Sequence, residues 1–372
     1  MEIKERNSNF ELMRIISMLF IILYHIIIHG QVVELCTNDF LRTLFKIIEI
    51  ATLVHVNSFI LLTGYFQPTC RFKQSKVWKI INASLFYRII IVIVLTTMGI
   101  ITLDKLSIFK NFFPLEIYHN WFIKYYIILY CMSPLLNASI NHMNRKTFKR
   151  TIIVLFFLFC LFPTLTGCQT FENNGYTLYH FIYLYLIGAY LRKFSIFKSS
   201  VLKDKSVCRQ RFILTIIIAL CIGINFIIYK FALNYVGNNN FIRELCSSIS
   251  LFHLYYNNPL VLLQSVCYFL LFSTFNIKSK LINIISSLTI GIYLIHDNTY
   301  IRTNIYTWLG INTTPVTSIV FLVRYLLITF IIFISCAIIE YIRQKLFSFI
   351  YNLKFSKVIR NRYYYLLEKI GI

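Results

Sequence analysis

Two residues in the first apolar stretch of the chain have side chains that could do acid–base or anion chemistry. Arg14 and His25 are eleven positions apart, which on an α-helix is three turns and about 20°. They should therefore share one helix face, about 16 Å apart along the axis. A histidine can take up and return a proton near neutral pH, and an arginine can hold an anion through two hydrogen bonds. The structural alternative is an arginine that reaches the lipid headgroups and a histidine satisfied inside a bundle.

The elements that must position these residues are membrane helices. The 372 residues are 58% hydrophobic and 14% charged, whereas a soluble domain is about 45–50% apolar and about 25% charged. The apolar runs are continuous rather than alternating, which favours helices over a barrel. We predict an all-α integral membrane protein, a bundle of about ten transmembrane helices near 12–29, 43–64, 80–101, 121–138, 151–167, 178–191, 212–229, 259–275, 281–300 and 317–340.

The distribution of charge predicts how this bundle is oriented. If the N-terminus is cytoplasmic, 26 of the 37 lysines and arginines lie on the cytoplasmic side and five lie in the opposite loops. The positive-inside rule then places both the N- and C-termini in the cytoplasm. This reading also explains the net charge of +23 without a nucleic-acid partner. We expect one membrane domain over 1–340, followed by a basic, aromatic cytoplasmic tail over 341–372 that lies along anionic membrane lipids.

The ten cysteines are scattered and form no CxxC pair and no Cys/His spacing typical of a metal site. A cysteine inside an apolar helix behaves as a small hydrophobic residue. We therefore predict no disulfide framework, no metal and no permanently bound cofactor.

An arginine followed by ten residues and a histidine in the first helix resembles the signature of the acyltransferase-3 family of integral membrane acyltransferases. Other segments resemble that family in the same order along the chain, namely NSFILLTGYF at 57–66, the basic stretch 71–88, the tryptophan-led helix at 121–137, and the segments 181–194 and 288–302. The resemblance implies transfer of an acyl group, usually acetyl from cytoplasmic acetyl-CoA, to a hydroxyl of a cell-surface or lipid-linked polysaccharide such as a capsule or exopolysaccharide. It also implies a multi-pass protein of the bacterial cytoplasmic membrane.

Under this resemblance His25 would act as a general base or as a transient acyl carrier. Arg14, Arg71, Lys79 and Arg88 would bind the phosphates of acetyl-CoA from the cytoplasmic side. For the loop residues the alternative is ordinary positive-inside topology. Arg88 differs because it lies about two turns inside its helix, where an arginine needs an anion, a carbonyl or water.

The acceptor would meet the outer ends of two helices. Trp121 and Lys124 begin one of them, and His296 and Asp297 end another. Each pair could instead be an interfacial belt or a polar helix end. We interpret Gly64 as a close-packing or turn glycine.

A transporter or flippase for a lipid-linked sugar would share the helices, the basic inner face and the internal histidines. Such proteins often contain paired repeats and helices broken by Gly or Pro. Neither is evident in a chain with six prolines and no internal repeat, so the acyltransferase is the favoured reading.

Overall fold

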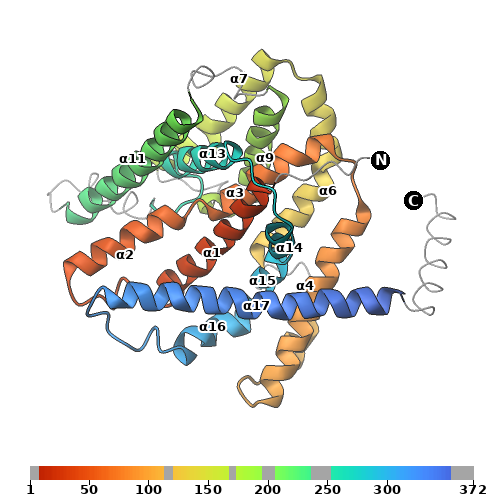
Figure 1. The fold of residues 1–372 in the computed structure, drawn as a ribbon, viewed down its shortest axis with the longest axis vertical. Coiled ribbons are helices and arrows are strands. Elements are labelled where there is room, and N and C mark those ends of the chain that lie inside the picture. Colours follow the sequence, from red (N-terminus) through yellow and green to blue (C-terminus); the bar gives the residue numbers. More distant parts are fainter. Residues whose placement is uncertain (1–7, 113–119, 167–172, 195–205, 236–252, 353–372) are drawn as a thin grey trace.

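A computed structural model describes residues 8–112, 120–166, 173–194, 206–235 and 253–352 (Figure 1). These residues form helices and contain no β-strand, apart from one isolated bridge between Cys36 and Val316. The helices run in the order α1 (Asn9–His29), α2 (Asp39–Thr52), α3 (His55–Phe66), α4 (Gln74–Thr97), α5 (Lys105–Lys110), α6 (Trp121–His142), α7 (Arg145–Phe156), α8 (Phe162–Thr166), α9 (Leu178–Lys193), α11 (Val207–Asn234), α13 (Pro259–Ser273), α14 (Lys280–Ser287), α15 (Thr289–His296), α16 (Thr299–Trp308) and α17 (Val320–Asn352).

Each of the ten predicted segments falls mainly on helix. Among the described residues, six helical segments are long and apolar enough to cross a membrane: Asn9–His29, Asp39–Thr69, Gln74–Thr97, Arg145–Thr166, Val207–Asn234 and Val320–Ile350. Pro259–Ser273 and Lys280–His296 are shorter apolar helical segments. The prediction of a helical membrane-spanning fold is therefore confirmed, while the total of ten spans and the cytoplasmic position of both ends stay predictions.

Two of the predicted helices are broken in the structure. The segment 43–64 divides at Leu53 and Val54 into α2 and α3, and the freed Thr52 carbonyl is met by His55 Nδ1 at 2.6 Å. The segment 281–300 divides at Leu288 and again after His296, which separates α14, α15 and α16. Both segments are helical as predicted, and side chains replace the missing helical hydrogen bonds at the breaks.

Helix α1 lies at the centre of the bundle and packs against α2, α3, α13, α14, α15 and α17. A buried apolar cluster lies on each side of it, one mainly with α4, α15 and α17 and the other mainly with α3, α9 and α13. By contrast, α4, α11 and α17 expose many large apolar side chains, such as Ile93, Ile227 and Phe330, as helices that face lipid do.

Helices α3 and α9 pack closely against each other. Gly64 and Gly188 face each other across this helix pair, and a Cβ atom at either position would fall within 2.3 Å of a backbone oxygen of the other helix. The interpretation of Gly64 as a close-packing residue is confirmed.

The C-terminal helix α17 continues past the predicted domain boundary at 340 as far as Asn352. The remainder of the predicted tail lies outside the described residues.

Candidate functional site

A cavity of about 480 Å³ runs beside α1. Side chains from one face of that helix line it, beginning with Glu11 and Arg14 and ending with His25 and His29. Arg14 and His25 thus border the same cavity, one at each end of a run of apolar residues. Helices α3, α6, α14 and α15 close the other sides.

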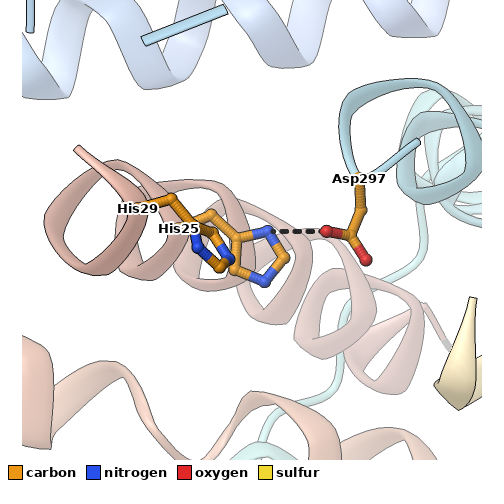
Figure 2. Close-up of side chains that lie close together, drawn as sticks. All are labelled: His25, His29 and Asp297. Atoms are coloured by element: carbon orange, nitrogen blue, oxygen red, sulfur yellow. Dashed lines mark ion pairs between the residues drawn. The ribbon is translucent and has the colours of Figure 1, made fainter. Parts of the chain in front are cut away.

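His25 lies in a group of polar rings and charges at one end of this cavity. Its Nδ1 atom is 3.6 Å from Oδ1 of Asp297, and Figure 2 shows the imidazole facing that carboxylate across the gap between α1 and the end of α15. The rings of His29 and His296 lie 5.1 and 5.4 Å from that of His25. On its other side, Asp297 pairs with Arg302, whose Nη1 is 3.0 Å from the same Oδ1 atom.

Three of these residues could also hold a metal ion. His25, His29 and Asp297 place one ligand atom each within 4.8 Å of one another, and two histidines with a carboxylate form a known type of zinc ligand set. However, the guanidinium of Arg302 already occupies the carboxylate oxygen and adds a positive charge beside any cation. The geometry therefore favours a carboxylate–imidazole pair.

The opposite end of the cavity is organised around Arg14. Its Nη1 donates to Oε2 of Glu11 at 2.7 Å, and the hydroxyl of Ser286 on α14 donates to the same oxygen. Glu11 is 6% exposed, whereas the Arg14 side chain is 26% exposed. The buried carboxylate thus fixes the arginine while part of the guanidinium stays accessible. Sequence reasoning missed Glu11, although an acid three residues before an arginine in an apolar helix was a signal.

Aromatic side chains form one wall of the cavity. The ring of Tyr176 lies 4.6 Å from that of Trp121 and 4.9 Å from that of Tyr256. The ring nitrogens of His55 lie 2.6 Å from the Thr52 carbonyl and 3.1 Å from the Tyr256 hydroxyl. Because a carbonyl only accepts, Nδ1 of His55 donates to it, and in the neutral ring Nε2 then accepts from Tyr256.

Burial raises the pKa of both Tyr176 and Tyr256, so both phenols stay protonated donors. Sequence reasoning missed these two tyrosines, because they lie in connections where no helical periodicity marks a face.

Of the predicted acceptor-side residues, Trp121 and Asp297 line the cavity and Lys124 and His296 do not. The Lys124 ammonium lies over the ring of Tyr125, 5.3 Å from its centre. His296 is buried against His25, and its Nδ1 donates to the Ile292 carbonyl at 2.8 Å.

Of the residues predicted to bind the donor, some line the cavity and others do not. Arg14 lines the cavity, but Arg71, Lys79 and Arg88 are not among its lining residues. Arg71 and Lys79 are exposed at the surface, and Arg88 is 1% exposed inside the bundle.

Comparison with known proteins gives one match. A family model described as an acyltransferase domain matches residues 7–341. No curated protein and no solved structure matches the chain.

Proposed function

The chain belongs to the acyltransferase-3 family, and from that premise we propose that it moves an acetyl group from cytoplasmic acetyl-CoA to a hydroxyl of a cell-surface or lipid-linked polysaccharide. The observation that carries the proposal is the cavity with Arg14 at one end and His25 at the other. In the predicted orientation, Arg14 faces the compartment that contains coenzyme A, and His25 lies towards the acceptor.

The donor enters at the Arg14 end. Coenzyme A is polyanionic, and an arginine held by a neighbouring carboxylate presents its free N–H groups in a fixed direction. The exposed Arg71 and Lys79 add to the positive potential of the predicted cytoplasmic face, which attracts such a donor. The apolar middle of the cavity, which includes Met18 and Ile21, suits the uncharged pantetheine arm and excludes water from the thioester.

His25 serves the transfer itself. As a general base, it takes the proton of the acceptor hydroxyl while the oxygen forms a bond to the thioester carbonyl carbon. The carbon–sulfur bond then breaks, and the imidazolium returns the proton to the departing thiolate. In the second route, the imidazole nitrogen attacks the thioester carbonyl carbon, the carbon–sulfur bond breaks and coenzyme A leaves as the thiolate. The acceptor hydroxyl then takes the acetyl group from the nitrogen and gives up its proton as the carbon–nitrogen bond breaks. Rapid quenching that traps a labelled acetyl-histidine distinguishes the second route from the first.

The acceptor lies against the aromatic wall. Rings of Trp121, Tyr176 and Tyr256 offer flat apolar surfaces to the C–H face of a sugar. No covalent cofactor is needed for either route, because the energy of transfer resides in the thioester.

The test is acetyl transfer in isolated membranes that contain the protein, supplied with radiolabelled acetyl-CoA. We expect label in the polysaccharide fraction and a loss of about 10²–10⁴-fold in His25→Ala, as for removal of a general base. His142→Ala is the matched control, because His142 is exposed at the end of α6 and does not line the cavity. Equal labelling by His25→Ala and wild type, at equal protein levels, would show that the proposed site is wrong.

A further inference from the structure

The break between α15 and α16 puts a carboxylate next to His25. Asp297 follows the last residue of α15, and the side chain of Asn298 caps α16 by accepting from the Tyr300 N–H at 3.1 Å. The cap turns the chain so that Arg302, on the first turn of α16, points back to Asp297. The Asp297 side chain is 2% exposed, and its Oδ1 atom lies 3.6 Å from His25 Nδ1 and 3.0 Å from Arg302 Nη1.

We propose that Asp297 is a positioning residue for His25 and that Arg302 sets how strongly the carboxylate acts on it. This inference rests on the proposed function, because it assigns the two residues to the same proton transfer. It replaces the expectation from the sequence that Asp297 binds the acceptor.

The position of Asp297 selects which nitrogen of His25 reacts. A carboxylate can only accept hydrogen bonds, and the ring nitrogen nearest to it is Nδ1, at 3.6 Å. At that distance no hydrogen bond forms, but the negative charge favours the tautomer that directs a proton on Nδ1 towards it and leaves the lone pair on Nε2 free. When Nε2 takes a proton from the acceptor hydroxyl, the resulting imidazolium lies beside a negative charge that stabilises it. A buried aspartate next to a catalytic histidine acts in this way in serine proteases.

Arg302 limits this effect. A buried carboxylate facing His25 alone would favour a permanently protonated ring, which could not act as a base. The guanidinium at 3.0 Å cancels part of that field, so the ring can start neutral and still be stabilised once it is protonated. The other titratable groups near His25 include the imidazoles of His29 on α1, His55 on α3 and His296 on α15. The phenol of Tyr24 on α1 lies against the His25 ring, and that of Tyr293 on α15 lies beside Asp297.

Removing the charge of Asp297 and removing that of Arg302 should shift the pH dependence of acetyl transfer in opposite directions. Acetyl transfer from radiolabelled acetyl-CoA is followed against pH in permeabilised membranes, so that both faces have the same pH. In Asp297→Asn we expect the rate to fall at least tenfold and the acidic limb of the profile to move to lower pH by about one unit, because the negative charge is gone. In Arg302→Gln we expect the limb to move to higher pH, because the opposing positive charge is gone.

Matched controls come from a second aspartate–arginine pair. Asp39 and Arg42 form an exposed pair on α2, with Arg42 Nη1 2.7 Å from Asp39 Oδ1. Asp39→Asn and Arg42→Gln are expected to leave both rate and profile unchanged. Asp297→Glu keeps the charge and is expected to retain the wild-type limb with a reduced rate. The double variant Asp297→Asn/Arg302→Gln leaves no buried charge unpaired, so it remains testable if a single variant fails to fold. We expect this double variant to transfer acetyl slowly, with the acidic limb of its pH profile near that of wild type.

Other outcomes would overturn the inference. The inference is contradicted if the acidic limb of the pH profile stays in place, or moves in the same direction, in both single variants. It is also contradicted if Asp297→Asn raises the KM for the glycan without shifting the limb, because that result indicates acceptor binding. Activity lost to a chelator and restored by Zn²⁺ would assign the cluster to a metal. In all these cases the proposed function still stands if His25→Ala has lost acetyl transfer. If His25→Ala retains acetyl transfer, the proposed function itself is refuted.

Discussion

Replacing Gly64 by alanine is expected to push α3 and α9 apart. A Cβ atom at Gly64 would lie 2.2 Å from the carbonyl oxygen of Tyr185 and 2.7 Å from its Cα, whereas ordinary contact begins at 3.4 Å. Both neighbours are backbone atoms and cannot rotate away. The helices must therefore separate by about 1.2 Å at this point, the difference between 3.4 and 2.2 Å.

The size of the effect follows from what the separation disrupts. Forcing an extra methyl group into a close-packed interface costs about 1–3 kcal/mol, and the better helix propensity of alanine offsets at most about 1 kcal/mol of this. The Gly64→Ala protein should therefore be less stable by up to about 2 kcal/mol after this offset. Its acetyl transfer should also fall, because α3 carries His55 and Phe59 into the cavity. Gly188→Ala acts on the same contact, so the double variant should lose less than the sum of the single losses.

Thermal unfolding of the detergent-solubilised protein measures this loss. The matched control is Gly223→Ala in the middle of α11, where a Cβ atom would meet nothing within 4 Å. That variant should melt at or slightly above the wild-type temperature, because only helix propensity changes. If Gly64→Ala melted with the control, the close approach of α3 and α9 would not be a determinant of stability, and the reasoning would be wrong.

Three further substitutions test other parts of the bundle. Glu340→Ala should lower the free energy of unfolding by about 1–3 kcal/mol, because it removes the buried carboxylate that accepts from the buried Tyr87 hydroxyl at 2.6 Å and from the half-buried Arg343 at 2.7 Å; a melting temperature equal to that of wild type would contradict this. Glu11→Gln should raise the KM for acetyl-CoA several-fold at an unchanged protein level, because Arg14 loses the carboxylate that orients it; an unchanged KM would show that Arg14 does not need it. Lys193→Met should cost about 1 kcal/mol, because the exposed ammonium donates to three carbonyls at the end of α6, and unaltered unfolding would count against this role.

The sequence predicts the helices well because lipid imposes a simple rule on it. A span needs about 20 apolar residues whatever surrounds it, so apolar runs locate the helices without tertiary information. The spacing of Arg14 and His25 similarly depends only on helix geometry. The break at Leu53 and Val54 could not be predicted in this way, because both residues are apolar and neither is Gly or Pro. The signal of this break in the sequence is a pair of polar residues that follows it, His55 and Asn57.

The neighbours of His25 depend on tertiary structure, so span length and helix spacing do not predict them. Asp297 and Arg302 are more than 270 positions away along the chain, and only the packing of α15 against α1 brings the carboxylate to His25. An ionisable residue near a helix end has two common explanations in a sequence, interface or site. The structure distinguishes them residue by residue, since it places Asp297 in the cavity and the Lys124 ammonium over an aromatic ring outside it.

The broken helices explain why polar side chains lie near the cavity. Three helices that expose many large apolar side chains, α4, α11 and α17, are continuous over 24, 28 and 33 residues. A continuous helix satisfies its own backbone and can face lipid. The breaks between α2 and α3 and along α14 to α16 free carbonyl and N–H groups, which need polar partners that lipid does not supply.

Those partners are residues of the cavity. His55 meets the freed carbonyl at the first break, and the Thr289 hydroxyl donates to the Ser286 carbonyl at 2.9 Å at the second. At the third break, the Asn298 cap leaves Asp297 facing His25. Each break thus requires polar side chains at membrane depth, and each places such a side chain against the cavity. In this bundle the interrupted helices supply polar side chains to the cavity that we propose for acyl transfer.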